Sequence, residues 1–234
     1  PKKIDEIIIK ETDELIKKFG DERRTQIIDE DLSITKAEEE IIKEDILLLI
    51  NNKGLAKSFP LNTSIEKILK NKDEVGKIIL TNTQDKLLTY SQSGKMYTIP
   101  VSEFYGTNKY LESTIILDKN DQLKDVLTYK NKKYILCLTK FGLGKKLKID
   151  DVISNRKSGI QIIKLKDNDN LVRVLAVNDE PIIIFTKNGF ALGIKDQIPI
   201  QGRSSSGVRL IKLSQNDNVF NISVVNKNYV NLEI

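Results

Sequence analysis

The stretch Ser158-Gly159-Ile160-Gln161-Ile162-Ile163-Lys164-Leu165 returns 48 residues later as Ser206-Gly207-Val208-Arg209-Leu210-Ile211-Lys212-Leu213. Four aspartates keep the same spacing of 48 residues, namely Asp73, Asp121, Asp169 and Asp217. A period of about 40 to 50 residues with short strands is typical of architectures in which each copy is one small antiparallel sheet of about four strands. We therefore predict an all-β, propeller-like fold of about four to five blades.

Each copy also carries a predicted β-hairpin. A short apolar run is followed each time by a dipeptide that ends in Gly, which supplies the positive φ of a tight turn. The runs and their turns are Ile46–Ile50 with Lys53-Gly54, Leu87–Tyr90 with Ser93-Gly94, Tyr134–Leu138 with Phe141-Gly142, and Ile182–Phe185 with Asn188-Gly189. An ordinary β-sandwich with chance similarity is the alternative. Counting on from Asp217, the next hairpin Gly would fall just past Ile234, so we expect a fifth unit that is incomplete in this sequence.

The first residues have a different character. Apolar residues recur at helical spacing in residues 1–19, and Gly20 stands where a helix would stop. We predict a terminal helix and linker over residues 1–25 and a β domain over residues 26–234.

Composition excludes several kinds of chemistry. The chain has 234 residues, a formal net charge of +5, one Cys and no His. A Ser-His or Cys-His catalytic pair and the common zinc sites therefore cannot be assembled. Gly142-Leu143-Gly144-Lys145 lacks the Lys-Ser or Lys-Thr ending of a nucleotide loop and lies on a predicted hairpin. We predict no catalytic residue, no metal and no cofactor, and we expect the Cys137 thiol to be a small buried hydrophobe.

The apolar stretches are too short to span a membrane, and the Lys-rich start has no apolar core of an export signal. We expect a cytoplasmic protein.

Cations recur near the predicted hairpins and in the loops between them. Small residues beside Arg let backbone amides and the guanidinium approach a phosphate together, independently of base sequence. Cations at equivalent places on successive copies would form a curved positive track, whereas the alternative is a set of solvated loops. The predicted DNA-binding residues are Lys57, Lys95, Lys145, Lys146, Lys148 and Lys195 after the hairpin glycines, and Arg156, Lys157, Arg203 and Arg209 in the loops.

Several motifs resemble type IIA topoisomerase A subunits. Residues 18–25, Lys-Phe-Gly-Asp-Glu-Arg-Arg-Thr, resemble the end of the breakage-reunion part. Residues 82–88, the repeated block and Gly202-Arg203-Ser204 with Gly207-Val208-Arg209 resemble the C-terminal domain that follows. The resemblance implies a β-pinwheel, in which blades share strands with their neighbours and duplex DNA bends around a basic rim. It also implies that the active-site tyrosine lies outside this chain.

Two members of the family are candidates. Gyrase A subunits carry a Gln-Arg-Arg-Gly-Gly-Lys-Gly type heptapeptide after a first-blade hairpin, whereas here Lys57 is followed by residues 58–64, Ser-Phe-Pro-Leu-Asn-Thr-Ser. The chain is therefore more similar to the topoisomerase IV A subunit. That resemblance implies a non-catalytic domain that engages duplex DNA for ATP-dependent strand passage. It further implies an A2B2 heterotetramer with the ATPase B subunit, association with the nucleoid and no membrane partner.

Three alternatives stay open. The chain could be a gyrase wrapping domain without the heptapeptide. It could also be a propeller-type scaffold that binds protein, although the absence of Trp and His argues against WD40 repeats. The basic rim could instead bind RNA or acidic lipid.

Overall fold

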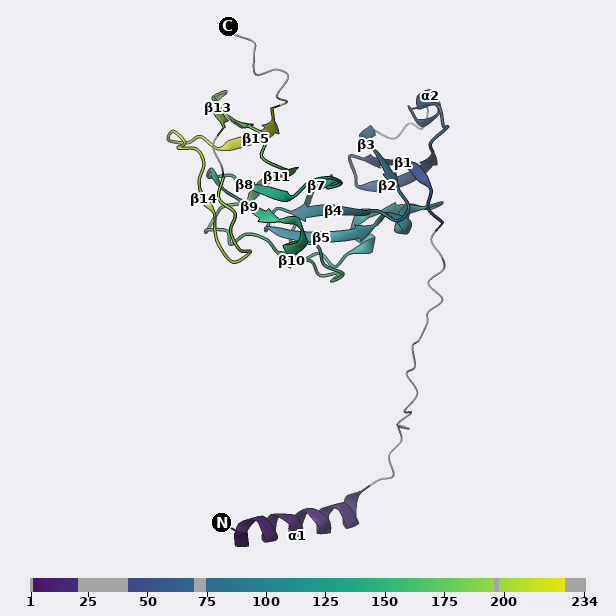
Figure 1. Cartoon of the computed structure of the whole chain (residues 1–234), viewed down its shortest axis with the longest axis vertical. Helices are drawn as coiled ribbons and strands as arrows, with labels where there is room; N and C mark the ends of the chain where they lie inside the picture. The colour runs from purple at the N-terminus through teal and green to yellow at the C-terminus, as the bar shows by residue number, and fades with distance from the viewer. Residues whose placement is uncertain (1, 21–41, 70–74, 196–197, 226–234) are drawn as a thin grey trace. The chain divides into compact units, whose positions relative to one another are not determined.

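The computed structural model describes residues 2–20, 42–69, 75–195 and 198–225. The chain divides into two compact units, residues 1–40 and 41–234. In the first unit, helix α1 (Lys2–Phe19) confirms the predicted terminal helix (Figure 1). The predicted boundary after residue 25 lies outside the described residues. Neither of the two described α-helices is both long and apolar enough to cross a membrane.

The described part of the second unit contains four antiparallel sheets, which we name blades A to D. Blade A has the order β3 (Val75–Asn82), β1 (Asp45–Asn51), β2 (Leu55–Pro60), β6 (Asn108–Tyr110), with α2 (Ile65–Leu69) between β2 and β3 in the chain. Blade B has the order β10 (Ile160–Gln161), β5 (Lys95–Pro100), β4 (Lys86–Ser91), β7 (Leu123–Leu127). Blade C has the order β11 (Leu171–Val177), β8 (Tyr134–Thr139), β9 (Leu143–Lys148), β14 (Val208–Arg209). Blade D has the order β13 (Ala191–Ile194), β12 (Ile182–Thr186), β15 (Val219–Val224). Short 3-10 helices η1 (Val101–Phe104), η2 (Leu111–Thr114) and η3 (Ile149–Asp151) lie in the connections.

All four predicted hairpins are present, as β1-β2, β4-β5, β8-β9 and β12-β13. A polar side chain that ends the first strand accepts a hydrogen bond from the backbone beyond the turn. In blade C, for example, Thr139 Oγ1 accepts from the Leu143 N–H at 3.2 Å, and Gly142 has a φ of 80°. The turn therefore closes through a side chain and a glycine.

In blades B, C and D, the recurring aspartate accepts hydrogen bonds from the hairpin turn of its own blade. Asp121, Asp169 and Asp217 accept backbone N–H groups from Ser93, Phe141 and Asn188, at 3.1, 3.1 and 3.2 Å. The residue before each aspartate is an Asn with a φ of 61° to 65°, a conformation that Asn tolerates better than most residues. Asp73 lies outside the described residues. The 48-residue spacing of these three aspartates thus follows from a hydrogen-bonded contact that is made once in each of blades B, C and D.

Blades A, B and C each borrow their fourth strand from the next repeat. Strands β6, β10 and β14 pair with β2, β5 and β9, but each follows the hairpin of the next blade in the chain. Equivalent backbone hydrogen bonds of 2.9 Å hold the shared strands β10 and β14 in place. They run from Ile162 N–H to Gly94 O and from Leu210 N–H to Gly142 O. This sharing confirms the predicted β-pinwheel. Among the described residues, β13 of blade D has no strand on its outer edge.

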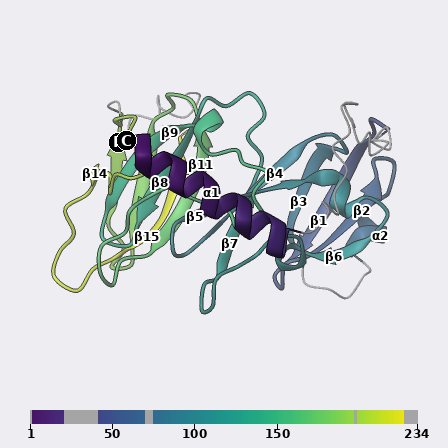
Figure 2. The same cartoon turned by 90° about the horizontal axis from the view of Figure 1, so that it is seen from below.

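The core lies between consecutive blades rather than inside one of them. Leu136 and Leu138 of β8 pack toward blade D, whereas Ile135 and Cys137 pack toward blade B. Both faces of the sheet are therefore buried, which explains why the run from Tyr134 to Leu138 is continuously apolar. Cys137 is fully buried, as predicted. Figure 2 shows the blades in succession, from the blue strands β1 to β3 to the green strands of blade C.

Candidate nucleic-acid interface

A groove of about 930 Å³ lies between loops of blades B and C. Three cations line it, and none of its described lining residues is a carboxylate. The lining residues are Ser93, Arg156, Gly159, Ile160, Gln161, Lys164, Leu165, Arg203 and Ser204. Arg156, Lys164 and Arg203 are all exposed to solvent. A concave, net positive surface with small residues beside its cations suits a phosphate backbone.

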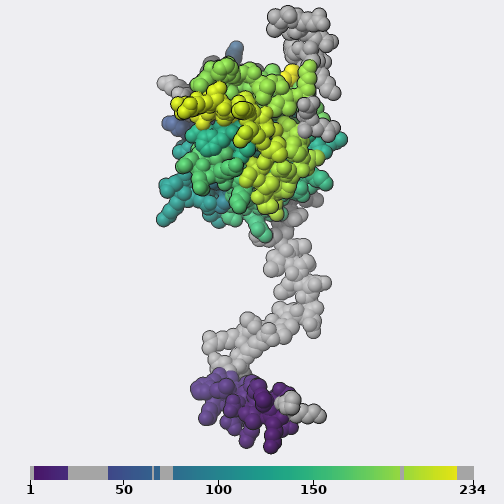
Figure 3. Space-filling view, turned by 90° about the vertical axis from the view of Figure 1, so that its left-hand side faces the viewer, coloured from purple at the N-terminus to yellow at the C-terminus, as the bar shows by residue number. Residues whose placement is uncertain are grey.

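The repeat itself brings these cations together. Arg156 lies in the loop that leads to β10, and Arg203 lies in the loop that leads to β14. The two segments are joined directly, because the Lys164 N–H donates to Ser205 O at 3.1 Å. In the space-filling view, the C-terminal part of the described chain, yellow-green to yellow, lies at the surface of the face shown (Figure 3). Neighbouring copies of one loop therefore form the two sides of the groove.

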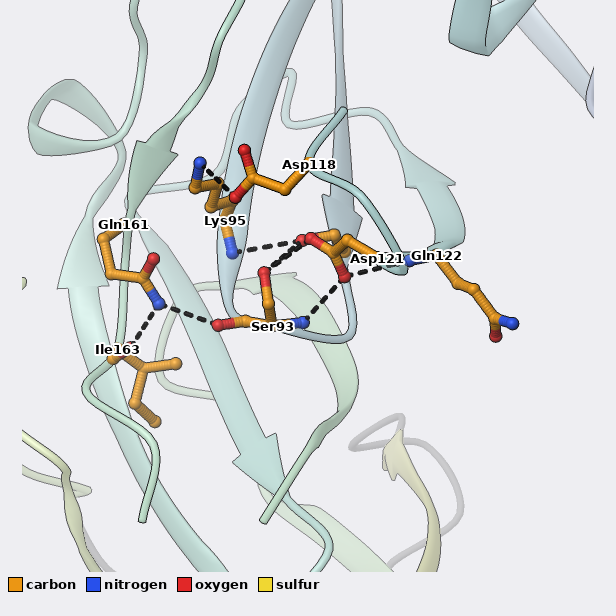
Figure 4. Close-up of polar contacts among 8 residues, drawn as sticks. Ser93, Lys95, Asp118, Asp121, Gln122, Gln161 and Ile163 are labelled. Carbon is orange, nitrogen blue, oxygen red and sulfur yellow. Dashed lines mark hydrogen bonds and ion pairs between the residues drawn. The ribbon is translucent and has the colours of Figure 1, made fainter. Parts of the chain in front are cut away.

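Gln161 and Asp121 hold the end of the groove formed by the blade B hairpin (Figure 4). Gln161 Nε2 donates to Ser93 O at 2.8 Å and to Ile163 O at 2.9 Å. Asp121 accepts the Ser93 N–H at 3.1 Å and the Ser93 hydroxyl at 2.5 Å. Burial raises the pKa of Asp121, but hydrogen bonds from Ser91 and Ser93 outweigh burial and leave that pKa lowered. The carboxylate is therefore ionised at neutral pH and keeps the turn fixed.

The structure places two predicted residues, Arg156 and Arg203, in one groove, with the exposed Lys157 beside Arg156 in the chain. Lys164 was missed by the sequence reasoning, although its signal was present. Lys164 and Lys212 occupy equivalent positions in the repeated block, which we used for its period and not for its charge.

Two predicted contacts need correction. Lys145 is fully buried, and its ammonium bonds to the backbone of residues 202–205. Lys146 is 6% exposed; its Nζ lies 2.8 Å from Asp179 Oδ1 and 5.0 Å from the centre of the Tyr134 ring. Both faces of blade C are covered, so neighbouring lysines that point to opposite faces are both buried. Neither ammonium can meet a phosphate in this position.

The other predicted cations are not among the residues that line the groove. Lys95 forms an ion pair with Asp118, with 2.7 Å between Nζ and Oδ2. Lys57 is half-buried on β2 and has an interaction partner of its own. The exposed remainder are Lys148 at the end of β9, Lys195 just after β13, and Arg209 in β14. In place of the predicted continuous track, the described residues show one cluster of cations in the groove and three exposed cations that do not line it.

These features define a class: a strand-sharing β-repeat domain with a basic groove between adjacent blades. The family model described as "DNA gyrase C-terminal domain, beta-propeller" matches residues 45–63, 85–108, 133–178 and 180–226, which is more than half of the chain. The chain belongs to this family. Arg156, Lys164 and Arg203 all lie within the matched segments.

Curated relatives point the same way. The DNA gyrase A subunit of Leptospira biflexa is 30% identical over 226 residues, which cover 88% of this chain and 27% of the relative. That of Treponema pallidum is 28% identical over 225 residues, covering 88% of this chain and 28% of the relative. The chain thus spans about a quarter of the length of these relatives.

Solved structures share the fold. The C-terminal domain of DNA topoisomerase IV superposes with a TM-score of 0.66 at 21% identity, covering 80% of this chain and 62% of that one. The Escherichia coli ParC C-terminal domain superposes with a TM-score of 0.65 at 14% identity, covering 78% of this chain and 80% of that one. The named relatives include both gyrase and topoisomerase IV, so these similarities do not separate the two.

Proposed function

We propose that this chain is a non-catalytic domain that holds duplex DNA for a type IIA topoisomerase A subunit. The observation that carries the proposal is the groove in which Arg156, Lys164 and Arg203 converge without a carboxylate among the described lining residues. A guanidinium donates two parallel hydrogen bonds to a phosphate, and the Lys164 ammonium adds a point charge. Such contacts grip the backbone and do not depend on base sequence.

The strength of binding should follow from counterion release. Each neutralised phosphate contributes about −0.9 to the slope of log K against log salt concentration, so three contacts give about a 40-fold loss of affinity between 50 and 200 mM salt. If the exposed cations outside the groove join them, about six contacts give roughly a thousandfold loss. The measured slope therefore counts the cations that touch DNA.

Bending is the second part of the proposal. Lys148, Lys195 and Arg209 are exposed on blades C and D. We propose that a duplex meets them and the groove together by curving across successive blades. Bending 20 to 30 base pairs by 40° to 90° takes on the order of 1 to 6 kcal/mol, which the additional phosphate contacts would offset. Strand passage itself would come from the whole enzyme, with its cleavage tyrosine and ATPase subunit outside this chain.

Between the two family members, we propose the topoisomerase IV type. Residues 58–64 after Lys57 do not contain the basic, glycine-rich heptapeptide of gyrase. The gyrase-type alternative is supported by the names of the curated relatives. Sealing nicked plasmid in the presence of the chain separates these candidates, because chiral wrapping leaves a change in linking number and simple holding does not.

A salt titration tests DNA holding itself. Anisotropy of a labelled 30-base-pair duplex is measured with the full chain at several salt concentrations. We expect a steep negative slope and little dependence on base sequence. A flat slope, or complete competition by anionic vesicles or by RNA at equal nucleotide concentration with no preference for duplex DNA, would remove the proposal.

A further inference from the structure

Lys145 is fully buried, yet hydrogen bonds satisfy its ammonium group. Nζ donates to Gly202 O at 2.7 Å, to Ser205 O at 2.9 Å and to Ser205 Oγ at 3.1 Å, and Arg203 O lies 3.2 Å away. An ammonium has three donors, so these oxygens can use all of them. A buried charge is tolerated only with such partners. The contacts therefore define a specific structural site inside blade C.

The segment bonded to Lys145 forms one side of the groove. Gly202 and Ser205 flank Arg203 and Ser204, which are the two residues of this segment that line the groove. The Ser205 hydroxyl also donates to Gln201 Oε1 at 2.8 Å. Lys145 thus ties the backbone on both sides of the residues that face the groove, while those two side chains stay exposed.

Blade B holds its equivalent loop by different chemistry. Tyr97 lies 48 residues before Lys145, at the same position of its strand. It packs against Gly159, where an added Cβ would lie 2.7 Å from the Tyr97 ring. The loop is fixed further by a bond of 3.1 Å from the Ser154 N–H to Thr98 Oγ1. The equivalent residues of β5 and β9 therefore each contact a loop that carries an arginine. In blade B the Tyr97 ring contacts the loop with Arg156, and in blade C the Lys145 ammonium contacts the loop with Arg203.

We propose that Lys145 is a positioning residue: it clamps residues 202–205 from inside the blade, and so presents Arg203 and Ser204 to a DNA phosphate without touching DNA. This inference rests on the proposed function. A loop that is ordered before binding loses less conformational freedom on association, which raises affinity without a new contact. Burial lowers the pKa of Lys145, while the neighbouring Cys137 acts in the opposite direction.

The binding test is a double-mutant cycle on the full chain. Lys145→Met keeps an unbranched side chain that is one atom shorter and removes the ammonium, and Arg203→Gln removes the presented group. We expect each single variant to weaken binding of a 30-base-pair duplex by roughly tenfold, as for loss of one charge-assisted hydrogen bond. The double variant should bind as tightly as either single variant. Lys133→Met, which removes an exposed lysine ahead of β8, is the control. Additive losses would overturn the clamp, since Lys145 would then act independently of Arg203.

A DNA-free readout separates failure of the clamp from failure of the proposed function. Amide hydrogen exchange of residues 202–205 should accelerate at least tenfold in Lys145→Met, while residues 154–159, held by Tyr97, should not change. Unchanged exchange at 202–205 would contradict the clamp whether or not the protein binds DNA. If the loop responds but the wild-type chain does not bind duplex, the proposed function fails and the clamp stands as a structural device.

Chemical labelling covers the case in which Lys145→Met does not fold. In the native wild-type chain, an amine-acetylating reagent should modify Lys133 readily and leave Lys145 unmodified. Ser205→Ala, which removes one of the acceptors, should increase exchange of the loop by a smaller factor than loss of the ammonium. Acetylation of Lys145 at the rate of Lys133, or a Ser205→Ala loop as protected as the wild type, would overturn the clamp.

Discussion

Lys77 and Asp125 lie 48 residues apart and form an ion pair, with 2.9 Å between Nζ and Oδ1. The second carboxylate oxygen of Asp125 lies 2.9 Å from Nη1 of Arg173, which is a further 48 residues along the chain. The three residues occupy equivalent positions on β3, β7 and β11. One carboxylate therefore links three consecutive blades, and the period of the sequence appears directly as an interaction between repeats.

Asp125→Asn should lower the free energy of unfolding by about 1 to 2 kcal/mol, because two partly exposed ion pairs of one network are lost together. Urea unfolding followed by circular dichroism measures the change. Asp118→Asn is the matched control, since Asp118 is 57% exposed and pairs with Lys95. We expect less than about 0.5 kcal/mol there. Equal effects of the two substitutions would contradict a structural link through Asp125.

Strand sharing can be tested at two hairpin glycines. Gly142 and Gly189 have φ values of 80° and 86°, so an alanine is strained by about 1 kcal/mol at either position. At Gly142 a new Cβ would also lie 2.8 Å from Ile211 O, on the segment supplied by the next repeat, whereas at Gly189 it meets no atom of the described residues within 4 Å. Gly142→Ala should therefore destabilise the domain by roughly 2 kcal/mol more than Gly189→Ala. Thermal unfolding that ranks the two equally would be evidence against the shared strand.

The Cys137 thiol should be unreactive in the folded protein. It is fully buried between blades B and C, and burial raises its pKa to about 12, while Lys145 acts in the opposite direction. The thiolate is the reactive form, so a thiol reagent at pH 8 should label none of the native protein and one equivalent after unfolding. Stoichiometric labelling without denaturant would show that the hydrophobic core between blades B and C is accessible to the reagent.

Asp121 should contribute to stability in a pH-dependent way. Its pKa is lowered from 3.8 in the folded protein, because hydrogen bonds from Ser91 and Ser93 outweigh burial. The folded state therefore binds the proton less tightly than the unfolded state, so the stabilisation is present above roughly pH 4 and is lost as the pH falls through the folded value. Asp121→Asn should be less stable at pH 7 and should show a shallower fall in stability below pH 4 than the wild type. Parallel curves for the two proteins would contradict this role.

The period and the turn chemistry were sufficient to predict the hairpins, since these depend on local signals repeated at fixed spacing. The sharing of strands was implied only by the family resemblance, because it pairs segments that lie far apart in the chain, such as Ile160 with Met96. The sequence did not reveal that Lys145 and Lys146 are buried. Two adjacent lysines near a hairpin resemble a solvated strand end, and the oxygens that accept from Lys145 come from a loop 57 to 60 residues later. Burial of these charges is a property of the packed blades, which no short segment encodes.

Because Lys145 and Lys146 are buried, substitutions at these two positions do not test the groove. Reversing the charge of Lys145 or Lys146 would place a carboxylate in the interior and damage the fold. Arg156, Lys164 and Arg203 are exposed, so their neutral variants should leave the stability within about 0.5 kcal/mol of the wild type. A variant with three other exposed lysines neutralised, Lys119, Lys130 and Lys187, removes the same charge from outside the groove.

The most direct measurement is the slope of log K against log salt concentration for duplex binding by the wild type, the Arg156→Gln/Lys164→Gln/Arg203→Gln variant and the Lys119→Gln/Lys130→Gln/Lys187→Gln variant. If the groove holds the phosphate backbone, the slope of the groove variant should be smaller by about 2.7, and the slope of the second variant should match the wild type. If both variants lose slope equally, or neither does, binding follows net charge or another surface, and the groove is not the DNA site.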